Sequence, residues 1–97
     1  MAQFDVHRLG DTLVVDCQSD LLTQLDTRFV VPLIPRDRAP IPASRLNPLF
    51  AIGGEDLVMA PQFASAVPRR DLSAPVTSLA DRAFDLIDAL DVLIGGV

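Results

Sequence analysis

The clearest pattern in the chain is an apolar stripe of helical period close to its C-terminus. Apolar residues recur there at steps of four, three, four and three, with two isoleucines beside them: Leu79, Ala83, Leu86, Leu90 and Leu93, with Ile87 and Ile94. Such spacing places side chains on one face of an α-helix. Ser78 is a favourable N-cap, Asp81 can reach back to it, and Gly95 ends the pattern. The sequence therefore predicts a helix from Ser78 to Ile94.

The opposite face of this predicted helix is acidic. Asp81, Asp85, Asp88 and Asp91 recur three or four residues apart, and Arg82 is the only cation among them. Like charges at these spacings repel one another, and carboxylates near a helix C-terminus lie at the negative end of its dipole. Two interpretations follow. The face is either simply solvated, or it is kept acidic to meet a basic surface of a partner.

Before this helix, apolar residues alternate with the two-residue period of β-strands. Gln3–Leu9 and Thr12–Gln18 are predicted strands, and Gly10 and Asp11 between them are typical of a hairpin turn. Alternate residues of the second strand face opposite sides of the sheet. One side carries Leu13, Val15 and Cys17, and the other carries Val14 and Asp16. Because Cys17 shares a side with aliphatic residues, we expect it in the core.

Shorter strands are predicted along the rest of the chain: Arg28–Ile34, a hairpin of Leu49–Ile52 with Leu57–Ala60, and a last strand at Arg69–Leu72. Pro32 cannot donate to a β-ladder, so it marks an edge or a bulge. The proline-rich segment Pro35–Pro48 is expected to be irregular, with a short helical turn at Ala43–Leu46. The expected fold is one mainly antiparallel β domain, spanning residues 1–97, with one C-terminal α-helix.

The segment Ser19–Asp26 interrupts the alternation with apolar residues in a polar setting. Leu21, Leu22 and Leu25 lie there among Asp, Thr and Gln. Apolar residues in a loop are either tucked beneath the sheet or offered to a partner. The sequence leaves both interpretations open.

Composition adds an expectation about assembly. The chain has 97 residues, of which 49% are hydrophobic, and its mean hydropathy is +0.35. A domain of this size has one modest core, so this apolar excess suggests burial in an oligomer. The net charge of −5 argues against direct binding to nucleic acid, which requires a basic surface.

Candidate catalytic and metal-binding chemistry is sparse. His7 is the only histidine, and no nucleophile or carboxylate pattern accompanies it, so we expect a surface or edge histidine. Cys17 is the only cysteine, which leaves no internal disulfide and no cysteine metal site. The sequence predicts no enzyme, no cofactor and no metal. It shows neither a signal-peptide pattern nor an apolar run of 18 residues, so we expect a cytoplasmic protein.

Short segments spread over the whole chain form a recognisable series: Gln3-Phe4 with Val6, Val15 to Leu22, Arg28 with Val30 to Leu33, Leu46 with Pro48, Ile52-Gly53, Phe63 to Pro68, and the C-terminal helix. In this order they resemble the CcdB-type toxins of bacterial toxin–antitoxin modules, which poison DNA gyrase. The resemblance implies a small SH3-like antiparallel β-barrel that forms a symmetric homodimer, with the C-terminal helices near the twofold axis.

The same resemblance implies a function and a set of partners. Toxins of this type bind the A subunit of DNA gyrase and trap the enzyme on cleaved DNA. A cognate antitoxin neutralises the toxin with a disordered segment that folds on binding. The toxin–antitoxin complex also represses its own operon, and the antitoxin supplies the DNA contacts, which suits an acidic toxin.

The residues that the resemblance assigns to gyrase binding lie in two segments: Leu21 and Leu22 in the loop, and Asp91, Ile94, Gly95, Gly96 and Val97 at the chain end. One of them departs from the family pattern. Well-characterised members end in Trp-Gly-Ile, and their Trp stacks on an arginine of gyrase, whereas this chain has Gly95 at that position and no Trp. Asp91 stands where the family has an amide.

Three hypotheses about function follow from these observations. The first is a non-enzymatic gyrase-inhibiting toxin that is controlled by an antitoxin. The second is a CcdB-fold binding protein with another target or reduced toxicity, because Gly95 replaces the aromatic anchor. The third is a structural interaction domain without a toxin role, which a growth assay of the protein expressed alone separates from the first two.

Overall fold

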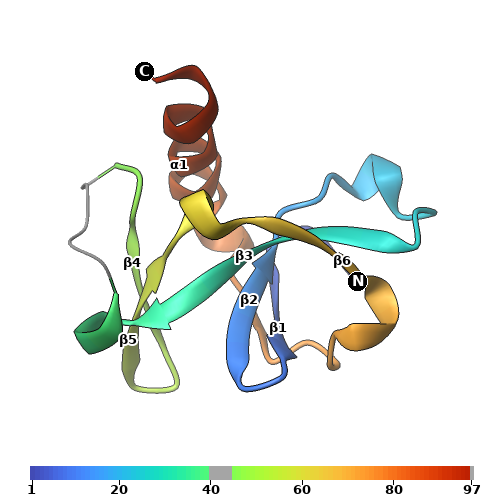
Figure 1. Cartoon of the computed structure of the whole chain (residues 1–97), viewed down its shortest axis with the longest axis horizontal. Coiled ribbons are helices and arrows are strands. Elements are labelled where there is room, and N and C mark those ends of the chain that lie inside the picture. The colour runs from blue at the N-terminus through green and yellow to red at the C-terminus, as the bar shows by residue number, and fades with distance from the viewer. Residues whose placement is uncertain (40–44, 97) are drawn as a thin grey trace.

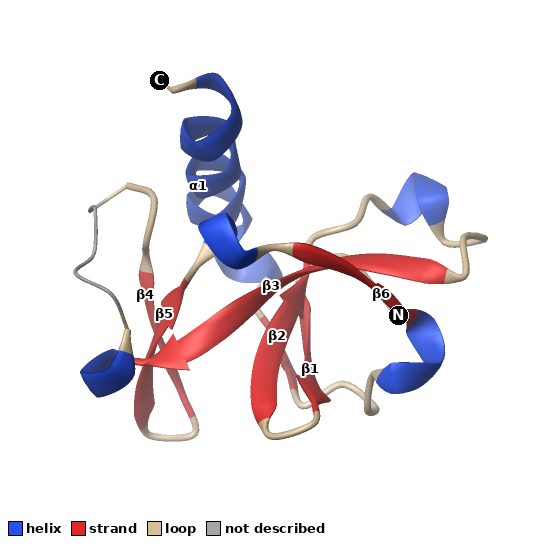
Figure 2. Ribbon diagram, in the orientation of Figure 1, coloured by secondary structure: helices blue, strands red, loops and turns tan. Residues whose placement is uncertain are grey.

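The computed structural model describes residues 1–39 and 45–96 as antiparallel strands that form a nearly closed barrel, with one helix at the C-terminal end (Figures 1 and 2). The strands and the α-helix are β1 (Asp5–Leu9), β2 (Thr12–Asp16), β3 (Thr27–Pro35), β4 (Leu49–Ile52), β5 (Glu55–Met59), β6 (Ser65–Pro68), β7 (Thr77–Ser78) and α1 (Ala83–Gly95). Short 3₁₀ turns separate them: η1 (Asp20–Leu22), η2 (Arg36–Arg38), η3 (Pro61–Phe63), η4 (Arg69–Asp71) and η5 (Ala80–Arg82). The mainly β fold with one C-terminal helix is confirmed.

Strand β3 is the centre of the sheet. The strand order is β4-β5-β3-β2-β1-β7, and β6 pairs with β3 outside that path. One edge of β3 pairs with β2, while the other edge pairs with β6 along Thr27–Val30 and with β5 along Leu33–Pro35. One strand therefore belongs to both halves of the barrel, and β4 and β7 are left as its outer strands.

Pro32 lies inside this central strand, so its predicted place at an edge or a bulge is wrong. The Cys17 N–H donates to the Phe29 carbonyl at 2.9 Å, and pairs of an antiparallel ladder alternate, so Pro32 falls opposite Val14 at a non-hydrogen-bonded position. Its nitrogen therefore faces the other edge, between the stretches that pair with β6 and β5. The ladder loses no donor there, and the Pro32 carbonyl still accepts from the Ala60 N–H at 3.0 Å.

Both predicted hairpins form, with shifted strand ends. Strand β1 begins at Asp5 rather than Gln3, because Phe4 has a left-handed backbone with φ of 70°. Strand β5 begins at Glu55, two residues earlier than predicted, because the turn consists of Gly53 and Gly54 alone. Their φ angles of 60° and 81° suit a two-residue hairpin turn that glycine adopts without strain.

The predicted helix is shorter than its sequence pattern. Ser78 belongs to β7, so the predicted N-cap is wrong; its hydroxyl accepts from the Ala80 N–H at 3.1 Å, at the start of the 3₁₀ turn η5. Within the described residues, Asp81 returns no hydrogen bond to Ser78. The α-helix then begins at Ala83. Figure 1 shows α1 rising away from the barrel, with its last turns farthest from the strands.

The principal core joins the helix to the inner side of the barrel. Its buried members come from both hairpins, from β3 and from the start of the helix: Phe4, Val6, Val15, Cys17, Val31, Leu33, Phe50, Leu57, Met59, Leu79, Leu86 and Ala89. The placement of Cys17 in the core is therefore confirmed. Ile87, Leu93 and Ile94 belong to the predicted apolar stripe but are exposed, so the stripe is narrower than predicted. Leu93 and Ile94 lie where α1 has left the barrel.

The other side of β2 and β3 is also buried, and it contains an ion pair. Asp16 and Arg28 are both fully inaccessible to solvent. Arg28 Nε donates to Asp16 Oδ2 at 2.8 Å, and Nη2 lies 2.6 Å from the same oxygen. Asp16 Oδ1 accepts from the Gln18 N–H at 3.0 Å. The pair therefore fixes β2 against β3 at the point where the chain leaves β2.

His7 is buried in β1, so the predicted surface or edge histidine is wrong. Its Nδ1 lies 2.8 Å from the Ser73 carbonyl oxygen. Because a carbonyl only accepts, Nδ1 carries the proton and donates it. Nε2 has no hydrogen-bond partner within the described residues. This histidine joins β1 to the segment that precedes β7.

The prediction of a last strand at Arg69–Leu72 is also wrong. Arg69–Asp71 forms the 3₁₀ turn η4, while the strand lies just before it, at β6. Pro68 ends that strand, and because β6 pairs only with β3 it is an edge strand, where a missing N–H is tolerated. The predicted helical turn Ala43–Leu46 falls partly outside the described residues.

Breaking the buried ion pair on one side should destabilise the protein. We expect Arg28→Met to lower the free energy of unfolding by about 3–5 kcal/mol, because Asp16 then stays buried without its cation. Asp16→Asn combined with Arg28→Met should recover most of this loss, since no charge remains and Asn keeps an acceptor for the Gln18 N–H. Urea unfolding followed by circular dichroism measures both. Equal destabilisation of the single and double variants contradicts the expectation.

The buried thiol should make stability depend on alkaline pH. Burial, with a further contribution from Asp16, raises the pKa of Cys17 from 9.0 to about 12. The folded state then holds a proton that the unfolded chain releases, so this stability is present below pH 9 and lost as the pH rises towards 12. We expect about 1.4 kcal/mol less stability at pH 10 than at pH 8, measured by urea unfolding.

The control for this measurement is Cys17→Ala. The chain contains neither lysine nor tyrosine, so the thiol is the only side chain that ordinarily titrates between about pH 8 and 12. The variant should show almost no change in stability over this interval. A similar loss in both proteins would show that another group is responsible.

Candidate partner-binding site

The loop between β2 and β3 begins with a local capping interaction. Ser19 precedes η1, and its hydroxyl accepts from the Leu21 N–H at 3.2 Å. The Asp20 carboxylate accepts from the Gln3 N–H at 2.9 Å, which attaches the turn to the N-terminal segment. These short polar side chains stabilise the turn where the alternation of β2 ends.

Side chains from outside the loop hold its remaining backbone in place. The Gln18 amide donates to the Leu22 carbonyl at 2.9 Å and accepts from the Phe29 N–H at 3.0 Å. Arg69 donates to the carbonyls of Thr23 and Leu25 from η4. The loop therefore has a defined shape before it meets a partner.

The apolar side chains of this loop point to solvent. Leu21 is 87% exposed, and Leu22 and Leu25 are also exposed. Of the two interpretations that the sequence left open, tucking beneath the sheet is therefore wrong for the single chain. A leucine held in solvent on a well-supported turn is typical of a surface that a partner covers.

The second predicted segment is the end of α1. Ile94 is 82% exposed, and Gly95 is the last residue of the helix. Gly96 follows in a left-handed conformation with φ of 71°, and its N–H donates to the Val92 carbonyl at 3.0 Å. This is an αL helix end, which glycine favours. Val97 lies outside the described residues.

The acidic face of the helix is partly neutralised within the chain. Arg82 Nε donates to Asp85 at 2.7 Å. Arg45 reaches Asp88 with a two-pronged contact, Nε to Oδ2 at 3.1 Å and Nη2 to Oδ1 at 2.6 Å. The hydrogen bonds from Arg45 lower the pKa of the Asp88 carboxyl. Within the described residues, Asp91 has no hydrogen bond or ion pair, so it is the free carboxylate next to the helix end.

Sequence reasoning missed one prominent residue of this helix. Phe84 is 87% exposed on the side opposite the buried Leu86. It is followed at helical spacing by the exposed side chains of Ile87, Asp91 and Ile94. The helical spacing from Phe84 to Asp91 is visible in the sequence and indicates a second face of the helix. The more regular apolar stripe that packs on the barrel obscured it. We call Phe84, Ile87, Asp91 and Ile94 the outer helix face.

The structure does not join the two predicted segments into one surface of a single chain. In Figures 1 and 2, η1 and the C-terminal end of α1 are separate projections that lie well apart in the view. Leu21 and Leu22 thus belong to one projection, and Asp91, Ile94, Gly95 and Gly96 to another. A partner that touches both must bridge that distance.

Within residues 1–39 and 45–96, no group of three or more His, Cys, Asp or Glu side chains is placed to hold a metal ion. His7 and Cys17 are both buried, away from the exposed loop and helix end. In the same part of the chain, no helix is both long and apolar enough to span a bilayer. What the exposed residues offer is apolar contact area beside a free carboxylate, which suits the binding of a macromolecule.

Comparison with known proteins agrees with this arrangement. A search of curated proteins gave no match. Comparison with protein-family models matches residues 3–96 to the family described as CcdB protein. The match covers nearly all of the chain, including both exposed segments, and the protein therefore belongs to the CcdB family of toxins from toxin–antitoxin modules.

Proposed function

We propose that this protein is a toxin that binds the A subunit of DNA gyrase and traps the enzyme on cleaved DNA. The observation that carries the proposal is the exposure of Leu21 and Ile94, on two supported projections, at positions that the family resemblance assigns to gyrase contact. Both side chains are more than four-fifths exposed, at 87% and 82%. Because the backbone beneath these side chains is already held in place, binding needs little further ordering of the main chain, which favours affinity.

A basic target is consistent with the charge at the helix end. Asp91 is the free carboxylate there, and the chain as a whole carries a net charge of −5. An ion pair between Asp91 and an arginine of gyrase contributes about 0–1 kcal/mol when exposed. The apolar contacts therefore have to supply most of the binding free energy.

The wider assembly that we propose follows the family. Two copies form a homodimer, and the outer helix face, with Phe84 and Ile87, supplies apolar surface for that contact or for a partner. An antitoxin neutralises the toxin and supplies the DNA contacts with which the complex represses its operon. An acidic toxin without DNA contacts of its own fits this division of roles.

Gly95 favours a second candidate, a CcdB-fold protein with reduced toxicity or another target. Loss of an aromatic anchor at an interface commonly costs about 2 kcal/mol or more, which is at least about 30-fold in affinity. Gly95 is the last residue of α1 and offers no side chain to replace that anchor. The two candidates differ in one measurable property, namely inhibition of gyrase.

Restoring the aromatic anchor should strengthen inhibition of gyrase. Gly95 lies within α1 and has no positive φ, so a side chain fits the backbone there. We expect Gly95→Trp to lower the concentration for half-maximal inhibition of DNA supercoiling at least about 30-fold, with Gly95→Ala as the matched control. Removal of residues 94–97 should abolish both inhibition and trapped cleavage complexes. If neither the natural protein nor Gly95→Trp inhibits the host gyrase, the second candidate replaces the first.

A charge at the tip of the loop should weaken target binding without unfolding the protein. Because Leu21 is exposed, Leu21→Asp should change the free energy of unfolding by less than about 0.5 kcal/mol. It should reduce gyrase affinity at least about 30-fold if Leu21 is a central contact. Leu25→Asp is the matched control, with the same change in an exposed position of the same loop. Equal effects of the two variants on titrated supercoiling inhibition would exclude a specific role for Leu21.

A further inference from the structure

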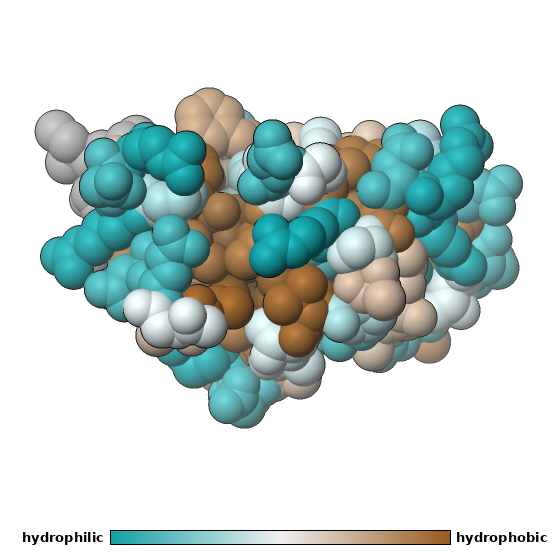
Figure 3. Space-filling model, turned by 90° about the horizontal axis from the view of Figure 1, so that it is seen from below, coloured by the Kyte–Doolittle hydropathy of each residue, from teal (hydrophilic) through white to brown (hydrophobic). Residues whose placement is uncertain are grey.

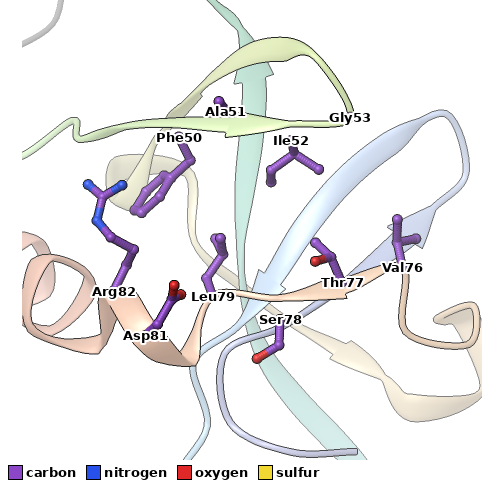
Figure 4. Close-up of a pocket in the computed structure, with 10 residues that line it drawn as sticks. All are labelled: Phe50, Ala51, Ile52, Gly53, Val76, Thr77, Ser78, Leu79, Asp81 and Arg82. Carbon is purple, nitrogen blue, oxygen red and sulfur yellow. The ribbon is translucent and has the colours of Figure 1, made fainter.

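A groove lies between the two outer strands of the barrel, apart from the loop tip and the helix end. Strands β4 and β7 stand at opposite ends of the strand order, and a cavity of ≈ 580 Å³ opens between β4 and the segment Val76–Arg82. Figure 4 shows Phe50 and Ile52 from one side, and Leu79 from the other, pointing into this space. Apolar surface also gathers in a hollow between polar lobes on the face drawn in Figure 3.

The outer edge of β4 offers free backbone groups to this groove. The Met59 N–H donates to the Pro48 carbonyl at 3.0 Å, which marks a hydrogen-bonded pair at the start of the β4–β5 hairpin. Because such pairs alternate, Leu49 and Ala51 direct their N–H and C=O groups away from β5. Within the described residues, no strand pairs with that edge. An unpaired strand edge is a template for another extended backbone.

The charges at the rim favour a basic ligand. The Arg82 guanidinium lies 4.5 Å from the centre of the Phe50 ring and is ion-paired with Asp85 at 2.7 Å. Asp81 also lines the groove, and within the described residues it has no hydrogen bond or ion pair. Its carboxylate is therefore the charge that the groove leaves available to a ligand.

We propose that this groove binds an extended, basic peptide segment of a partner protein, which pairs with β4 as an additional strand. One apolar side chain of the segment lies against Ile52 and Val76, the partly exposed apolar residues of the groove lining, and a basic side chain two residues away reaches Asp81. Strand β4 has four residues, so a segment of about five residues covers it. A second copy of this chain fits less well, because its own β4, Leu-Phe-Ala-Ile, has no basic side chain to reach Asp81.

This inference does not depend on gyrase as the target. The residues involved lie on β4, β7 and η5, whereas the proposed gyrase contacts lie on η1 and at the end of α1. A failure of one proposal therefore leaves the other intact. The binding mode proposed for the groove is strand addition, in which backbone hydrogen bonds give affinity and alternate side chains give selectivity.

The test uses the full chain, labelled with ¹⁵N, and a blocked peptide of sequence Lys-Thr-Val-Thr-Lys, in which each lysine lies two residues from the valine. With saturating peptide, we expect hydrogen exchange at the Leu49 and Ala51 amides to slow at least about tenfold. Ala51→Pro should weaken binding at least about tenfold, because it removes an outward N–H at a position where an edge strand tolerates proline. Ala51→Ser keeps the N–H and should bind like the natural protein. Asp81→Asn should weaken binding about threefold and reduce its salt dependence.

A second probe covers the case in which Ala51→Pro does not fold. The same peptide with N-methyl groups on its three central residues keeps the side chains but has no central N–H left to donate to β4, and it should bind at least about tenfold more weakly. Absence of any effect on Leu49 and Ala51 at about 1 mM peptide overturns the proposal. Equal binding of the methylated and the unmethylated peptide also overturns it. Protection of these amides that grows with protein concentration, without peptide, would assign the edge to a second copy instead.

Discussion

The buried contact between Asp16 and Arg28 is the constraint on which the geometry of the barrel and of its exposed loop depends. It lies where β2 ends, and it connects that strand to the central strand β3. A second oxygen of Asp16 turns the chain by accepting from the Gln18 N–H, and Gln18 then holds the carbonyl of Leu22. A charge pair hidden from water is thus connected, through Gln18, to the backbone of the loop that carries the most exposed leucine. Such pairs add little net stability, but removing one partner leaves an uncompensated buried charge, which is costly.

The fold could be predicted from local patterns wherever one side of an element was clearly apolar. The hairpins, the core position of Cys17 and the C-terminal helix all follow from alternation or from helical spacing. The errors concern positions where tertiary pairing overrides the pattern. Pro32 sits safely in a central strand because β5 and β6 divide the edge of β3, and His7 is buried because a segment more than sixty residues away supplies its acceptor. Neither arrangement has a local signal.

The candidate site was only partly predictable, for a related reason. The sequence identified Leu21, Leu22 and the chain end, but not whether the leucines faced water, because that depends on Arg69 and Gln18. The acidic row on α1 looked uniform, whereas Arg45, far away in the sequence, selects Asp88 and leaves Asp91 free. Phe84 shows the opposite case, since its spacing was readable but its outward position depends on which side of α1 packs against the barrel. Long-range partners distinguish residues that look equivalent in the sequence.

The way in which the loop is held has an evolutionary consequence. Gln18 and Arg69 bind the carbonyl oxygens of Leu22, Thr23 and Leu25, which are groups that every amino acid provides. The side chains displayed by the loop can therefore be exchanged while its backbone keeps the same path. Mutation can explore new surfaces there with little risk of misfolding, because the supports lie outside the varying positions. In a scaffold of this kind, the backbone shape of the loop can stay the same while the partner that its side chains recognise changes.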